Sequence, residues 1–140
     1  MIDDELNSKK DVTRVVMCSG KIYYDLLQKR NEDKIKDTAL VRIEQLYSFP
    51  YDDLESILSS YPNLNKFIWC QEEPANQGAW FSHRHRLQRV LDRLEQKHEI
   101  NLVSRPAAAA PAVGLMKLHL KQQEEIVLKA LNIGPQGEKE

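Results

Sequence analysis

The densest group of side chains able to do chemistry lies in residues 71–80, where two carboxylates and three amides surround a proline and a glycine. Paired carboxylates can act as a general acid and base when both face one site. Glu72 and Glu73 are adjacent, however, and neighbouring residues of an extended chain point to opposite sides. The stretch therefore suits a structural turn or a docking interface better than direct catalysis. The predicted interface residues are Gln71, Glu72, Glu73, Asn76, Gln77 and Trp80.

Two other segments carry a cation beside a predicted strand end. Ser19-Gly20-Lys21 opens a predicted helix, and free N–H groups at a helix start with a nearby ammonium form an anion site. The structural alternative is that Ser19 caps the helix and Gly20 permits the turn. Arg105 could clamp a carboxylate or phosphate, or bridge to Glu72 or Glu73. We favour the bridge, because those carboxylates are expected at the same edge of the sheet.

A basic segment follows Trp80, with seven basic side chains in residues 83–97. A basic stripe can bind nucleic acid. Acidic residues interrupt this one at Asp92 and Glu95, so a solvated helix face is the better account. His83 and His85 diverge on a regular helix, because only residues three or four apart are neighbours there. We therefore predict no metal site.

The elements that must position these groups alternate between strand and helix. Continuous apolar runs predict strands at 14–18, 38–43, 66–71 and 100–103, and helical spacing predicts helices at 21–29, 52–59, 77–98 and 115–131. Small residues interrupted by proline predict a tight connection at 107–112, before the last helix. Pro74 is expected to stop its strand and Asn76 to cap the next helix. Phe81 is placed on the buried stripe of that helix.

This pattern predicts an α/β three-layer sandwich with a mostly parallel sheet of about four or five strands and helices on both faces. The chain has 140 residues, enough for one domain. We predict a linker or disordered end at 1–12, one domain at 13–132 and a disordered tail at 133–140. The formal net charge of -1 gives no global attraction to nucleic acid or an anionic membrane. The two cysteines suit a reducing compartment, so a cytoplasmic location is expected.

Four segments carry a family pattern in this order along the chain: 18–26 (CSGKIYYDL), 41–46 (VRIEQL), 71–80 (QEEPANQGAW) and 104–114, with Ser104-Arg105-Pro106 leading to Ala110-Pro111-Ala112-Val113-Gly114. Together they resemble the carboxyl-terminal domain of the 2-oxoglutarate dehydrogenase decarboxylating component, which is thiamine-dependent. The resemblance covers residues from about 14 to about 131 and implies a fold like the C-terminal domain of transketolase.

The resemblance implies a function for the whole enzyme and a narrower one for this chain. The enzyme uses thiamine diphosphate and magnesium to decarboxylate 2-oxoglutarate, and it passes the succinyl group to the lipoyl arm of a succinyltransferase in the citric acid cycle. The Gly-Asp-Gly motif that binds the cofactor in that family is absent from this sequence. We therefore expect no cofactor and no catalytic residue here. The domain would dock on the preceding domains and on the homodimer mate, and it is predicted to be inactive alone.

One corner of the chain bears on regulation. In some members of the family this corner helps to bind acetyl-CoA as an allosteric activator, and Gln45 matches a contacting residue. Those relatives have arginines where Tyr51, Asp52 and Asp53 stand here, and acidic groups repel the phosphates that arginines would clamp. We expect Arg42 to pair with a nearby carboxylate instead. The alternative function is a free-standing or regulatory module that binds AMP or acetyl-CoA, with contacts from Ser19, Lys21, Arg42, Gln45 and Arg105.

Overall fold

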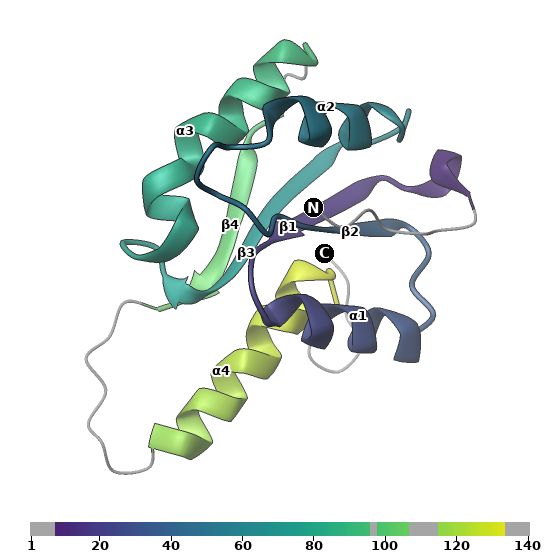
Figure 1. Cartoon of the computed structure of the whole chain (residues 1–140). Coiled ribbons are helices and arrows are strands. Elements are labelled where there is room, and N and C mark those ends of the chain that lie inside the picture. The colour runs from purple at the N-terminus through teal and green to yellow at the C-terminus, as the bar shows by residue number, and fades with distance from the viewer. Residues whose placement is uncertain (1–7, 96–97, 107–114, 134–140) are drawn as a thin grey trace.

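The computed structural model describes residues 8–95, 98–106 and 115–133. Within these residues, strands and helices alternate in sequence order (Figure 1). A short 3-10 turn, η1, comes first. The elements are η1 (Lys9–Asp11), β1 (Arg14–Cys18), α1 (Ile22–Glu32), β2 (Thr38–Arg42), α2 (Tyr51–Ser59), β3 (Lys66–Pro74), α3 (Gly78–Arg93), β4 (Ile100–Arg105) and α4 (Leu115–Ala130).

The strands form one four-stranded sheet in the order β2-β1-β3-β4, and every neighbouring pair is parallel. Helices α1 and α4 cover one face of the sheet, and α2 and α3 cover the other (Figure 1). The predicted α/β sandwich with three layers is therefore confirmed. The chain moves from β1 to β2 on one side and then returns across β1 to β3. At such a switch point the connections after two neighbouring strands lead to helices on opposite faces, which leaves a crevice at the carboxyl edge of an open sheet.

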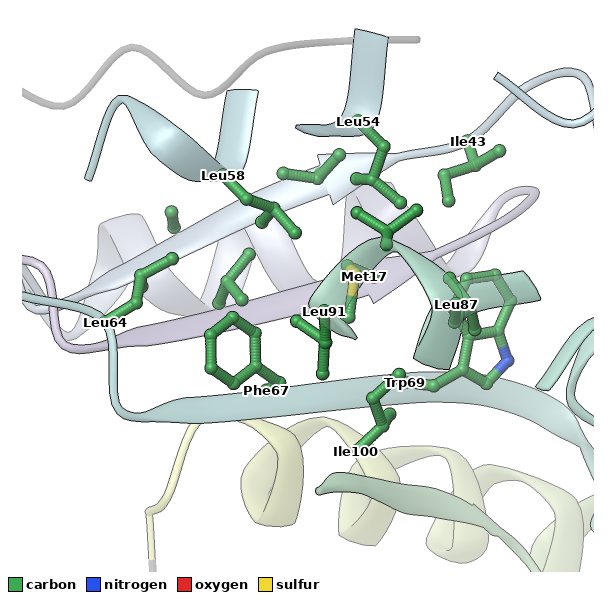
Figure 2. Packing of buried hydrophobic residues seen from close by; sticks show 14 of the residues in the cluster. Met17, Ile43, Leu54, Leu58, Leu64, Phe67, Trp69, Leu87, Leu91 and Ile100 are labelled. Carbon is green, nitrogen blue, oxygen red and sulfur yellow. The ribbon is translucent and has the colours of Figure 1, made fainter. Parts of the chain in front are cut away.

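Each strand supplies side chains to both faces, which explains why the strands read as continuous apolar runs. On β1, Val15 and Met17 point into the cluster under α2 and α3, and Val16 and Cys18 into the cluster under α1 and α4. Figure 2 shows the first cluster, in which Met17 lies among large side chains from β3 and α3. Alternate residues of a strand face opposite sides, so burial on both faces leaves no polar position in the middle.

Several predicted boundaries differ from the structure. Helix α1 continues to Glu32, three residues beyond its predicted end at 29. The strand β3 continues to Pro74, which lies opposite Arg105 after an irregularity in the ladder. Val12 was placed in the linker, yet it is fully buried. The predicted connection at 107–112 and the terminal segments 1–7 and 134–140 lie outside the described residues.

Phe81 was assigned to the buried stripe of α3, and this is wrong, because 72% of its surface is exposed. Leu87, Val90 and Leu91 are buried as predicted. Phe81 precedes Leu87 by six residues, and at about 100° per residue six positions turn the side chain well away from that face. The helix therefore presents an aromatic ring to the solvent near its start.

Candidate docking site at the carboxyl edge of the sheet

The side chain of Gln71 organises the turn between β3 and α3. Only 3% of the residue is exposed. Its Oε1 accepts hydrogen bonds from Trp69 Nε1 (3.0 Å) and from the backbone N–H of Trp80 (2.9 Å). Its Nε2 donates to the carbonyl oxygens of Pro74 (2.8 Å) and Gln77 (2.9 Å), with that of Glu73 at 3.1 Å. A buried amide whose oxygen and nitrogen are both satisfied holds the backbone around it in one shape.

This arrangement corrects the prediction that Gln71 contacts a partner, because its polar atoms are committed inside the domain. The signal for it was present in the sequence. Trp69 and Gln71 are two residues apart on a strand and therefore lie on the same face, which here is the α2/α3 face. The other hydrogen bond to Gln71 Oε1, from the backbone N–H of Trp80, depends on where α3 begins.

The start of α3 is capped from a distance. Gln77 is the N-cap residue and makes no side-chain cap bond, so the prediction that Asn76 caps the helix is wrong. Gln71 Oε1 satisfies one of the free helical N–H groups instead. Gly78 has φ +69, and a Cβ at that position would lie 3.1 Å from Glu73 Cδ and 3.2 Å from Gln71 Oε1. Glycine is needed here for both its dihedral and its size.

The remaining residues of the turn form its outer surface. Glu73, Asn76 and Gln77 are exposed, and Glu72 is half-buried. Trp80 is also half-buried: it packs against the α2/α3 cluster, and the Arg84 guanidinium lies 5.8 Å from its ring centroid. These residues are free to serve as the predicted interface, with Trp80 shared between the core and the surface.

Arg42 forms the ion pair expected of it. Its Nη1 lies 3.6 Å from Glu44 Oε1 and donates to the hydroxyl of Tyr24 at 3.1 Å. The guanidinium also lies over the Tyr24 ring, 5.1 Å from the centroid. Gln45 donates to the carbonyl oxygen of Tyr47 at 3.0 Å. Both candidates for an effector site thus have local partners.

Arg105 does not bridge to Glu72 or Glu73, and that prediction is corrected. It donates to α4 instead, through Gln123 Oε1 (2.5 Å), Gln122 Oε1 (3.3 Å) and the carbonyl oxygen of His119 (3.2 Å). Gln123 in turn donates to Asp25 on α1 at 2.9 Å. The register places Arg105 opposite Pro74, yet its side chain turns to the helix that covers β4. Arg105 therefore ties β4 to the α1/α4 layer.

The proposed anion contacts do not converge on one site. Ser19 and Lys21 follow β1, and Arg105 is the last residue of β4, with β3 between the two strands. Neighbouring strands are about 4.8 Å apart, and the Arg105 guanidinium already donates to α4. Gly20 has φ +86 and permits the turn as predicted. Ser19 does not cap α1, whose N-cap residue is Lys21 without a side-chain cap bond.

Burial favours the neutral forms of two cysteines and one histidine near this edge. Burial raises the pKa of the Cys18 thiol to about 12, against a smaller lowering by Arg42. Burial also raises the pKa of Cys70, its partner in the β1–β3 register. Burial and then the Arg86 guanidinium lower the pKa of His83, whose ring stacks on Phe49 with centroids 6.1 Å apart.

Across residues 8–95, 98–106 and 115–133, no three His, Cys, Asp or Glu residues gather closely enough to hold a metal ion. Among these same residues, no helix combines the length and the apolar character needed to cross a bilayer.

The fold and this edge define a small parallel α/β domain whose carboxyl-edge turn is stiffened by its own side chains. A family model described as "2-oxoglutarate dehydrogenase C-terminal" matches residues 1–131. The chain therefore belongs to the family of 2-oxoglutarate dehydrogenase carboxyl-terminal domains, as the resemblance had indicated.

Curated relatives agree with the family match. The chain is 49% identical over 129 residues to the 2-oxoglutarate dehydrogenase E1 component of Haemophilus influenzae, covering 92% of this chain and 13% of that protein. It is 51% identical over 131 residues to the corresponding protein of Coxiella burnetii, covering 92% of this chain and 14% of that one. The chain thus spans about one seventh of the length of these relatives.

Proposed function

We propose that this chain serves as the carboxyl-terminal docking domain of a 2-oxoglutarate dehydrogenase E1 component in the cytoplasm. The remainder of the enzyme would hold thiamine diphosphate and magnesium, decarboxylate 2-oxoglutarate and pass the succinyl group to the lipoyl arm of a succinyltransferase. The family match and the names of the relatives support this assignment. The free-standing nucleotide-binding module receives no support from them.

The carboxyl edge of the sheet carries the proposal. Its turn is rigid inside, through Gln71, and polar outside, through Glu73, Asn76 and Gln77. Exposed aromatic rings flank it: Tyr47 is 90% exposed and Phe81 is 72% exposed. Interfaces are enriched in aromatic residues, and a preorganised surface loses less entropy when it docks. The edge is therefore suited to contact the preceding domains and the second subunit of a homodimer.

A chimeric enzyme tests the proposal directly. In the Coxiella burnetii E1 component, this chain replaces the segment that it matches. We expect the chimera to reduce ferricyanide with 2-oxoglutarate, and the isolated 140-residue chain to show no such reaction. Turnover by the isolated chain would refute the proposal, and so would a folded chimera without turnover whose carboxyl edge remains fully accessible to solvent.

A matched pair of variants locates the docking face. In the chimera, Asn76→Arg introduces a long charged side chain at the exposed turn, whereas Asn101→Arg makes the same change at an exposed position of β4. We expect Asn76→Arg to lower turnover and dimer stability by about tenfold, because a misplaced charge at an interface costs more than 1 kcal/mol. Asn101→Arg serves as the control. Equal effects of the two changes would move the docking face away from this edge.

A further inference from the structure

The outward stripe of α3 combines an exposed aromatic ring with cations. Phe81, Arg84, His85 and Arg89 are all exposed, and their spacing of three, four and eight residues from Phe81 places them along one side of the helix. Phe81 alone exposes 72% of its surface. An isolated exposed ring is common on proteins, but here two exposed arginines, Arg84 and Arg89, follow it along the same side of the helix.

The first three turns of α3 carry only positive charge. Residues 78–89 contain three arginines and no acidic residue, although the chain as a whole has a formal net charge of -1. The partial positive charge of the helix amino terminus adds to this local excess. The first acidic residues come later, at Asp92 and Glu95. The positive region is therefore bounded and lies next to the turn that follows β3.

Two kinds of arginine can be distinguished on this helix. Arg93 is paired with Asp52 and Glu55 at 3.1 Å each, and Arg86 donates to the hydroxyl of Tyr51. These two hold α3 against α2. Arg84 and Arg89 instead rest on aromatic rings, with distances of 5.8 Å to Trp80 and 5.9 Å to Tyr51.

A ring contact uses the face of a guanidinium and leaves its in-plane N–H groups able to donate to a carboxylate. It also restricts the side chain before any partner arrives, so less entropy is lost on binding. Arg84 and Arg89 are thus preorganised donors on an exposed surface, with the Phe81 ring beside them.

We infer that the stripe formed by Phe81, Arg84, His85 and Arg89 docks an acidic, partly apolar segment of the E1 polypeptide that lies outside the region matched by this chain. The inference rests on the proposed function and names the chemistry of the partner at that face. The positive charge of the stripe calls for carboxylates on the partner segment, and the exposed Phe81 ring calls for an apolar side chain among those carboxylates. Most of the length of each relative lies outside the match, so the rest of the E1 polypeptide is long enough to contain a segment of this kind.

A protein partner fits this surface better than nucleic acid does. Single-stranded nucleic acid is bound on successive aromatic rings, whereas Phe81 is the one Phe, Tyr or Trp side chain of the stripe. The stripe is also continuous with Trp80 and the docking turn.

Hydroxyl-radical footprinting of the chimeric E1 tests the inference at single residues. The rate of Phe81 oxidation is compared between the isolated chain and the chimera, with exposed Leu120 of α4 as an internal reference. We expect Phe81 to be protected about fivefold in the chimera at low salt and less at about 0.5 M salt, because exposed charge pairs are screened. Arg84→Glu with Arg89→Glu is expected to abolish the protection. The control pair Lys36→Glu with Lys66→Glu makes the same charge change at exposed positions elsewhere and is expected to retain it.

The outcomes separate this inference from the proposed function. If the chimera turns over and its Gln71–Trp80 turn is protected while Phe81 remains as reactive as in the isolated chain, the inference is wrong and the proposed function stands. If turnover and all protection are missing, both are wrong. If the isolated chain binds a 20-nucleotide poly(U) RNA through Phe81 and the chimera leaves Phe81 reactive, the stripe is a nucleic-acid site and the inference is overturned.

Discussion

Replacing Gln71 with leucine tests whether one buried amide holds the carboxyl-edge turn. The change keeps the side chain close in size but removes its oxygen and its nitrogen. It leaves the Trp69 Nε1–H without its acceptor and the Trp80 N–H without the distant cap described above. The carbonyl oxygens of Pro74 and Gln77 lose their donor as well.

The expected loss of stability can be estimated from these bonds. A buried donor left without a partner costs about 1–3 kcal/mol, and loss of a helix cap costs about 0.5–2 kcal/mol. The two carbonyl oxygens lie nearer the surface, and water can replace part of their bonding. We therefore expect Gln71→Leu to lower the free energy of unfolding of the 140-residue chain by about 2–5 kcal/mol.

Urea unfolding followed by tryptophan fluorescence is the suitable assay, because Trp69 and Trp80 both bond to Gln71. The Trp69 indole N–H should also exchange with solvent faster in the variant, which NMR can record. Gln28→Leu is the control: Gln28 is exposed on α1 and donates to Glu32, so its loss should change stability by no more than about 0.5 kcal/mol. A Gln71→Leu chain as stable as the control would show that the amide does not hold the turn.

Three further predictions use the isolated chain. Gly78→Ala should destabilise it by about 1–3 kcal/mol, from a strained dihedral and the contact with Glu73, and more than Gly20→Ala, where φ is +86 but no atom lies within 4 Å of the new Cβ; equal losses in urea unfolding would remove the steric part of the explanation. Cys18 and Cys70 should resist Ellman's reagent at pH 8 until the chain unfolds, because burial raises the pKa of both thiols. The Cys18 thiol, with a pKa of about 12, is then ionised in about one molecule in 10⁴, and rapid labelling of the native chain would contradict this. The lowered pKa of His83 means that the unfolded chain binds this proton more readily, so stability should fall as the pH drops below about 6.5; His83→Gln should flatten that slope, and an unchanged slope would assign the pH dependence to other groups.

The fold could be read from the sequence to a large extent because its signals are local. Each strand is a continuous apolar run, since the sheet is covered on both faces, and each buried helical stripe repeats with a period set by about 3.6 residues per turn. Those patterns predicted four strands and the helices between them, together with the three-layer arrangement. The family resemblance also depended on short segments that need no structure to be recognised. Phe81 was wrongly assigned to the buried stripe of α3, because the helical period does not bring a residue six positions before Leu87 onto the same face.

The partners of the polar residues were decided by the tertiary structure. Both Gln71 and Glu73 looked like surface groups of one turn, yet the first is committed inside the domain and the second is exposed. Arg105 was expected to meet carboxylates at its own sheet edge, but it donates to residues of α4 that follow it by 17 and 18 positions. Backbone periodicity specifies which way a residue points along its own element. It carries no information on which distant element packs there, and that packing determines whether a polar group is satisfied within the domain or remains available to a partner.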